Sequence, residues 1–423
     1  MSAEDEQQGS LKIALLSYRS KPHCGGQGVY LRHLSRELVD LGHSVEIFSG
    51  QPYPELDRDE IVLTKVPSLD LYDDENPFRT PRLGEFRDWI DVLEFAHMKT
   101  GGFPEPLTFS LRVLRELKKR GGAFDVVHDN QVLGYGNLGI PKLFPFVTSI
   151  HHPISQDRKI EIDAARGWRQ HFGKRRWYGF VRMQGQVSAR LERILTVSSS
   201  SKRDIAKDFR TAPERIHVLP LGVDTEIFHP RGATEAKPLG ERVPGRIVAM
   251  ASADSPLKGV DVLLRAVAKI ATERDVHVII VSKPRDDGPT VKLVKELALG
   301  ERVTFVSGLS NDDLGDLMAT AEIAAVPSRY EGFSLPAVEH MASGTPLVAS
   351  AAGALPEVVG DAAVLVKPGD VEDLAAAIRR LHDSPAERER VGLAGYQRVQ
   401  ERYTWKAVAI ATVEHYRAAI KAH

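Results

Sequence analysis

The chain has 423 residues, of which 42% are hydrophobic and 27% charged, a composition typical of a soluble globular protein with two or three domains. Its 56 basic and 57 acidic residues nearly cancel, so the overall charge gives no sign of binding to nucleic acid or membranes. Cys24 is the only cysteine, which excludes an internal disulfide and a cysteine-rich metal site and fits a reducing compartment. The first ten residues lack the apolar region of a signal peptide, and no apolar run approaches the roughly 20 residues of a membrane span. We therefore expect a cytoplasmic protein.

The first half of the chain alternates short apolar strands with amphipathic helices. The stretch 11–17 predicts the first strand, and a glycine loop follows at 24–28. Apolar residues then recur mostly every three or four positions from Val29 to Leu41, a helical spacing that ends at Gly42. Further strands are predicted at 45–48, 124–128, 145–150, 193–197 and 216–220.

The alternation is lost between residues 51 and 109, where seven prolines interrupt the sequence. We interpret this segment as a long insertion in the first domain. Long insertions in α/β folds usually carry specificity.

The same alternation restarts at about residue 245, after a stretch (225–244) that is rich in proline and glycine and has no periodicity. A helix is predicted at 260–271, and strands at 246–250, 276–281, 303–306 and 323–326. Continuous apolar strands between helices predict parallel sheets that are covered on both faces. We predict a first domain at 1–224, a linker at 225–244 and a second domain at 245–402. A last helix at 403–423 is expected to cross back onto the first domain.

The strongest functional signal lies at Val326–Pro346, VPSRYEGFSLPAVEHMASGTP. A strand is followed by a tight loop that opens a helix, with Pro336 in the first turn, where a missing N–H costs nothing. The N-terminus of such a helix is a favourable place for a diphosphate. Glu331 lies before this terminus and Glu339 about one turn inside the helix, and carboxylates accept hydrogen bonds well from sugar and ribose hydroxyls.

Glu331 and Glu339, eight positions apart, resemble the E-x7-E signature of retaining glycosyltransferase family 4, which has the GT-B fold. Further resemblances follow in the family's order at 25–28, 41–45, 149–151, 197–198, 222–228, 256–259 and 353–357. The resemblance covers residues 11 to about 416. It implies an α/β chain with two Rossmann-like parallel-sheet domains that face a central cleft. The first domain would bind the acceptor, and the second the nucleotide-sugar.

The resemblance also implies the reaction. A sugar would pass, with retention, from a UDP- or GDP-type nucleotide-diphosphate sugar to a hydroxyl acceptor, without a metal or another cofactor. Lys258 would neutralise the departing diphosphate, and Glu331 and His151 would bind the transferred sugar. Glu339 would bind the ribose. The main-chain groups that would complete the donor site belong to Gly25, Gly26, Gly332, Phe333, Ser334 and Leu335.

The chain departs from the family pattern near the expected diphosphate. The family usually has an arginine five residues before the lysine, where this chain has Ala253. Arg246 and Lys283 are candidate replacements. Ser334 stands where glycine is more common. These departures suggest a divergent subgroup with a modified donor pocket.

Two other features permit more than one interpretation. Between residues 158 and 193, ten basic residues stand against three acidic ones, with aromatic residues between them. The segment Lys174, Arg175, Arg176 and Trp177 suits an anionic membrane surface at the inner face, a phosphate-bearing acceptor, or a solvated helix pair with aromatic core contacts. Asp57-Arg58-Asp59 has the D-x-D form of a metal motif, but it lies in a polar stretch and is interpreted as surface.

Two rival functions remain open. The first is a different enzyme on the same fold, a sugar-nucleotide epimerase or a phosphorylase. The second is a non-catalytic nucleotide-sugar-binding protein, which the absent arginine near Ala253 favours. No nucleic-acid module is recognisable, and the sequence does not predict an oligomeric state.

Overall fold

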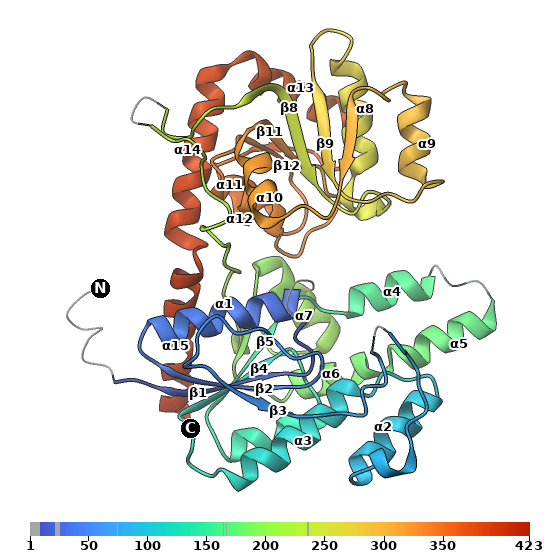
Figure 1. The fold of residues 1–423 in the computed structure, drawn as a ribbon, viewed down its shortest axis with the longest axis vertical. Coiled ribbons are helices and arrows are strands. Elements are labelled where there is room, and N and C mark those ends of the chain that lie inside the picture. Colours follow the sequence, from blue (N-terminus) through green and yellow to red (C-terminus); the bar gives the residue numbers. More distant parts are fainter. Residues whose placement is uncertain (1–8, 22–25, 74, 164, 166, 235–236) are drawn as a thin grey trace. The chain divides into compact units, whose positions relative to one another are not determined.

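The computed structural model describes residues 9–21, 26–73, 75–163, 165, 167–234 and 237–423 (Figure 1). The chain divides into two compact units. The first comprises Met1–Val197, Ser201–Leu219 and Val408–His423, and the second Ser198–Ser200 and Pro220–Ala407. Among the described residues, no helix has both the length and the apolar character needed to cross a membrane.

The first unit is built on a parallel sheet. Over the described residues its strands are β1 (Lys12–Ser17), β2 (Ser44–Ser49), β3 (Val62–Lys65), β4 (Val126–Asn130), β5 (Phe146–Ile150), β6 (Ile194–Thr196) and β7 (Ile216–Val218). Their spatial order is β3-β2-β1-β4-β5-β6-β7. The direction in which strands are added therefore reverses between β1 and β4. In open α/β sheets, ligands bind beyond the carboxyl ends of the strands at such a reversal.

Helices alternate with these strands along the chain. They are α1 (Gly26–Asp40), α2 (Trp89–Lys99), α3 (Glu105–Lys119), α4 (Ser155–Asp163), α5 (Trp168–Trp177), α6 (Gly179–Ser188) and α7 (Ser199–Phe209). Short 3-10 helices span Leu83–Glu85, Tyr135–Lys142 and Pro213–Arg215. The last helix, α15 (Trp405–Ala422), belongs to this unit from Val408 onward.

The segment 51–109, which we interpreted as an insertion, contains the edge strand β3 and helix α2. The Asp88 side chain caps α2 by accepting hydrogen bonds from the amides of Ile90 and Asp91. β3 has only four residues, and its Val62 is exposed. Such a short edge strand has no buried face that would require alternating apolar residues.

The second unit repeats this plan with the spatial order β10-β9-β8-β11-β12-β13. Its strands are β8 (Val243–Met250), β9 (His277–Val281), β10 (Val303–Val306), β11 (Ala321–Val326), β12 (Leu347–Ser350) and β13 (Val364–Val366). Its helices are α8 (Val260–Ile270), α9 (Pro289–Glu296), α10 (Asn311–Ala319), α11 (Leu335–Ala342), α12 (Leu355–Val359), α13 (Val371–Asp383) and α14 (Pro385–Arg402), with a 3-10 turn at Pro256–Lys258. The reversal falls between β8 and β11.

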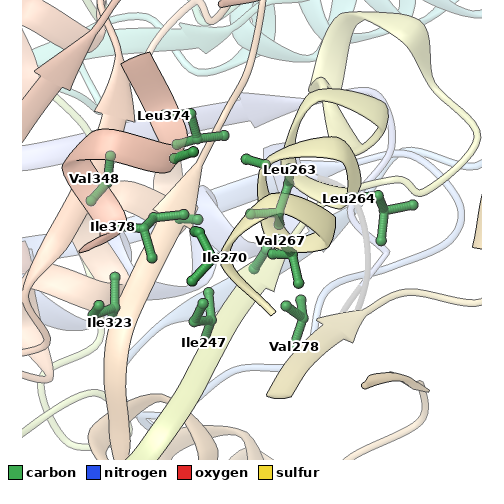
Figure 2. Close-up of a cluster of buried hydrophobic side chains, with 14 of the residues drawn as sticks. Ile247, Leu263, Leu264, Val267, Ile270, Val278, Ile323, Val348, Leu374 and Ile378 are labelled. Carbon is green, nitrogen blue, oxygen red and sulfur yellow. The ribbon is translucent and has the colours of Figure 1, made fainter. Parts of the chain in front are cut away.

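The core of the second unit lies between this sheet and helices α8 and α13. Figure 2 shows side chains of α8, among them Leu263, Val267 and Ile270, facing Ile247 of β8. Ile378 of α13 belongs to the same buried cluster. Fully burying such a side chain contributes about 1.5–3 kcal/mol, so this layer holds the sheet rigid beneath the loops at its edge.

Candidate active site

The loops after β8 and β11 bring Lys258 and Glu331 together. These strands are parallel neighbours, so the loops that follow them leave the same edge of the sheet. Nζ of Lys258 lies 2.8 Å from Oε1 of Glu331, although 73 residues separate the two in the sequence. The Ser328 hydroxyl donates to the same oxygen at 2.8 Å. The Lys258 side chain is 32% exposed and that of Glu331 only 9%, so the carboxylate is held in place while the cation stays accessible.

Helix α11 begins directly after this pair. Ser334 precedes its first residue with φ 87°, in the left-handed region that non-glycine residues rarely adopt. The Ser334 hydroxyl is buried and has no hydrogen-bond partner among the described residues. Phe333 is buried, with its ring edge-to-face to Tyr403. The first amides of a helix have no partner within it, so this terminus offers donors to an anion.

Glu339 lies on α11, one turn from its start. Its Oε2 is buried and unpaired in the part of the chain that the structure describes. This burial raises the pKa of Glu339 to about 7. Unpaired buried polar atoms are rare in folded proteins and need an explanation, and a ligand hydroxyl would supply the missing partner.

The glycine loop at 353–354, just before α12, supports the main chain of Glu331. The Ala354 amide donates to the Glu331 carbonyl at 2.9 Å. Gly353 has φ 58°, and a Cβ atom there would lie 2.2 Å from that carbonyl oxygen. Only glycine therefore fits this close approach.

The structure also places the candidates for the absent arginine. Arg246 donates to the hydroxyl of Thr320, which precedes β11. It therefore lies at the amino edge of the sheet, and the idea that it replaces the arginine is wrong. Lys283 follows β9 at the carboxyl edge and is exposed. Arg285, two residues on, has its amide bound to the Asp254 carboxylate at 2.8 Å.

His151 is located in the first unit, immediately after β5. Its Nε2 lies 2.7 Å from Oδ1 of Asn130, the last residue of β4. Burial lowers the pKa of His151 to about 4, so the ring is neutral at pH 7. Gly26 is the first residue of α1, whereas Gly25 lies outside the described residues. Sequence reasoning missed Asn130 because the predicted strand stopped at residue 128.

The basic residues at the end of α5 have two kinds of surroundings: some contact the segment 51–109 and others face solvent. Trp177 packs its ring against Tyr72 and Phe103, and Arg176 contacts His97 and Thr100, so both hold α5 to the segment 51–109. Trp177 is half-buried, and its ring contacts are those expected of a helix pair with an aromatic core, while a membrane or acceptor role of this segment stays a prediction. Lys174 forms an ion pair with Glu161, and Arg175 is exposed.

The D-x-D stretch is occupied by ion pairs. Asp57 binds the Arg32 guanidinium at 2.7 Å, and Arg58 binds Asp40. Within the described part of the chain, no group of three or more histidine, cysteine, aspartate or glutamate side chains is arranged to hold a metal ion.

Two family models match the chain. Residues 24–227 match Glycosyltransferase Family 4, and residues 233–398 match Glycosyl transferases group 1. An "MMP alpha-(1->4)-mannosyltransferase" from Mycolicibacterium hassiacum is 56% identical over 414 residues, covering 97% of this chain and 98% of the relative. A "D-inositol 3-phosphate glycosyltransferase" from Mycobacterium tuberculosis is 35% identical over 439 residues, covering 99% of this chain and 85% of the relative.

Solved structures share the fold at lower identity. Sucrose-phosphate synthase from Thermosynechococcus elongatus has a TM-score of 0.69 at 22% identity, covering 98% of this chain and 100% of that chain. Anabaena HepE, solved in complex with UDP, has a TM-score of 0.67 at 18% identity, covering 96% and 100%. Together with the two parallel-sheet units and the Glu331–Glu339 segment, these matches show that the chain is a glycosyltransferase of the GT-B fold and belongs to glycosyltransferase family 4.

Proposed function

We propose that this glycosyltransferase moves mannose from a nucleoside diphosphate mannose, of UDP or GDP type, to the 4-hydroxyl of a sugar acceptor. The product would be an α-(1→4) linkage formed with retention and without a metal ion. The relative that is 56% identical is named for α-(1→4)-mannosyl transfer, and the family resemblance supports retention. The observation that carries the proposal is the Lys258–Glu331 pair beside the N-terminus of α11.

The pair suits a departing diphosphate. As the bond between the sugar C1 and the phosphate oxygen breaks, negative charge builds up on the leaving group. Lys258 and the first amides of α11 would stabilise this charge, which is the type of effect that dominates catalysis. The acceptor oxygen would bond to C1 on the same face, and its proton would pass to the departing phosphate.

Glu331 would orient the sugar. Its Oε1 already accepts from Lys258 and Ser328, while none of the hydrogen bonds among the described residues uses Oε2. Oε2 can therefore accept from a sugar hydroxyl without breaking the ion pair. Glu339, on the same helix, would bind the ribose through its unpaired oxygen.

Transfer assays in EDTA with UDP- and GDP-mannose, and with other sugars of both nucleotides, test this proposal directly. We expect one mannose donor to give free nucleotide and an α-linked product, identified by NMR. Lys258→Ala should lower kcat by about 100–1,000-fold, the usual effect of removing one donor that stabilises charge in the transition state.

Lys119→Ala is the matched control, because Lys119 is an exposed lysine paired with Glu116 on α3. It should retain full activity, and both variants should unfold near the wild-type temperature. Three results would contradict the proposal: a β-linked product, loss of turnover in EDTA that added Mg²⁺ restores, or an isomerised sugar-nucleotide without transfer. D-inositol 3-phosphate belongs in the acceptor panel, since the 35% identical relative is named for it.

A further inference from the structure

Asn130, the last residue of β4, and Gln131, which follows it, both contact His151. Asn130 pairs across the sheet with Ser149 of β5, and His151 follows Ser149 by two residues. The Asn130 side chain bridges two groups: Nδ2 donates to the Gln27 carbonyl at 3.1 Å, and Oδ1 lies 2.7 Å from Nε2 of His151. The first residues of α1 and the ends of β4 and β5 are thus joined through one amide.

The chemistry of these partners determines where the His151 proton lies. The Gln27 carbonyl can only accept, so the amide nitrogen of Asn130 must face it and the amide oxygen must face His151. An amide oxygen also can only accept, so Nε2 of His151 must carry a proton. A neutral imidazole has one N–H, which leaves the lone pair on Nδ1.

The surroundings keep the ring neutral. Burial lowers the pKa of His151 to about 4. Its titratable neighbours in the described structure are Tyr30 of α1, whose ring centroid lies 4.4 Å away, and His128 of β4. Burial raises the pKa of Tyr30 to about 12 and lowers that of His128 to about 3, so both are uncharged at pH 7.

Gln131 holds the main chain of His151. Its Oε1 accepts from the His151 amide at 2.8 Å, and its Nε2 donates to the His152 carbonyl at 2.7 Å. Gln131 itself has φ 57°, in the left-handed region. Strained backbone of this kind persists only where the surroundings enforce it, and it gathers at functional sites. Gln184 supports the same turn by donating to the Val132 carbonyl at 3.3 Å.

We propose that Asn130 and Gln131 are positioning residues for His151. Asn130 sets the Nε2–H tautomer, so that Nδ1 accepts a hydrogen bond from a hydroxyl of the transferred sugar. Gln131 fixes the main chain from which the imidazole projects. This inference rests on the proposed function and on the family resemblance, which implies that His151 binds the transferred sugar. None of the hydrogen bonds among the described residues uses Nδ1 of His151, so this atom is available to a sugar.

The tautomer can be measured without substrate by NMR of protein labelled with ¹⁵N-histidine. His151→Gln identifies the resonances. In the wild type we expect a protonated Nε2 and an unprotonated Nδ1, and in Asn130→Leu a mixture of both tautomers. A wild-type ring protonated on Nδ1 would overturn the inference. Because no activity enters this measurement, it decides the role of Asn130 even if the chain proved to transfer no sugar and the proposed function fell.

A double-mutant cycle tests whether Asn130 acts through His151. Mutating a residue that orients a metal-binding histidine lowers metal affinity or activity by about 10–100-fold. By analogy, we expect Asn130→Leu to lower kcat/KM by about tenfold. In a His151→Ala background the same substitution should have no further effect. Gln131→Ala should likewise lower kcat/KM in the wild type and have no further effect in the His151→Ala background. Asn137→Leu, at a buried asparagine of the same unit, is the control whose effect should be additive. Additive losses for Asn130 would overturn the inference, as would full activity of His151→Ala.

Asn130→Asp is a second variant, which tests the same role if Asn130→Leu does not fold. A carboxylate beside Nε2–H would raise the pKa of His151, and the imidazolium has no lone pair on Nδ1. The acid limb of the kcat/KM–pH profile should therefore move from near pH 4 toward neutral pH. A purely structural role would leave that limb where it was, and such a result would count against the proposal.

Discussion

At the scale of single residues, unmet hydrogen-bonding capacity gathers at the start of α11. The Ser334 hydroxyl and Oε2 of Glu339 are buried without a partner among the described residues. Leaving such groups unpaired costs about 1–3 kcal/mol each, and folding alone gives no reason to keep them. The segment is therefore better suited to a ligand than to stability.

Glu339 makes stability depend on pH in a defined direction. Its pKa is about 7 in the folded protein and 4.5 normally, so between these values the folded state holds a proton that the unfolded state has lost. Stability therefore falls as pH rises from about 4.5 to 7, by on the order of 2–3 kcal/mol. Glu339→Gln should match the wild type near pH 4.5 and be more stable by that amount at pH 8, in urea unfolding without ligand. Glu401→Gln, at an exposed site on α14, should show no such change. Parallel wild-type and Glu339→Gln curves would refute the assignment.

At the scale of elements, the sequence predicted where strands lie better than where they end. The strand predicted at 303–306 coincides with β10, and the helix predicted at 260–271 is one residue longer than α8. The strand predicted at 124–128 is shifted, because β4 runs on through Asp129 and Asn130. Both residues are polar yet buried: Oδ2 of Asp129 accepts from Thr148, and Nδ2 of Asn130 donates to the Gln27 carbonyl. Apolar patterning cannot detect a strand that ends in buried polar residues.

The glycine loop before α12 should control activity through Glu331. Gly353→Ala forces a Cβ to within 2.2 Å of the Glu331 carbonyl, so the main chain of Glu331 must move. Gly360→Ala is the matched control: it has the same φ of 58°, but its Cβ would meet the guanidinium of Arg398. Both should lose stability of about 1–3 kcal/mol, because L side chains rarely adopt a positive φ. Only Gly353→Ala should also lower kcat/KM, by about tenfold or more, because small displacements at a reacting centre are costly. Equal kcat/KM values in steady-state assays would show that Glu331 does not need this support.

At the scale of the whole molecule, the C-terminal residues belong to the same compact unit as the N-terminal half of the chain. Residues from Val408 onward belong to the first unit, and Tyr416 of α15 is fully buried there. Its hydroxyl lies 2.7 Å from Nδ1 of His128, and Nε2 of His128 binds the Ser149 hydroxyl at 2.7 Å. The polar layer at the ends of β4 and β5 thus depends on the last helix.

Tyr416→Phe should weaken the first unit selectively. It leaves Nδ1 of His128 buried without a partner, at a cost of about 1–3 kcal/mol. Hydrogen exchange followed by mass spectrometry should show faster exchange in peptides from β4 and β5 and unchanged exchange in β8 and β11. Tyr396→Phe on α14, in the second unit, should leave β4 and β5 unchanged. Uniform loss of protection across both units would argue against this division of stability.

The sequence by itself determined what depends on local order. Apolar strands alternating with amphipathic helices predicted parallel sheets, and the spacing of Glu331 and Glu339 predicted a carboxylate on either side of a helix start, because eight residues span one loop and one turn. The resemblance to glycosyltransferase family 4 rested on such short segments, and the relatives confirmed the family.

Only the tertiary structure decided which distant residues meet. The order of strands in a sheet is set by long-range pairing, which hydrophobic periodicity does not record. That order brings Lys258 to Glu331 across 73 residues and Asn130 to His151 across 21, and it places Arg246 beside Thr320, which precedes β11. It also packed the half-buried Trp177 against Tyr72, because the fold of residues 51–109 supplied an apolar face that the composition of α5 could not reveal.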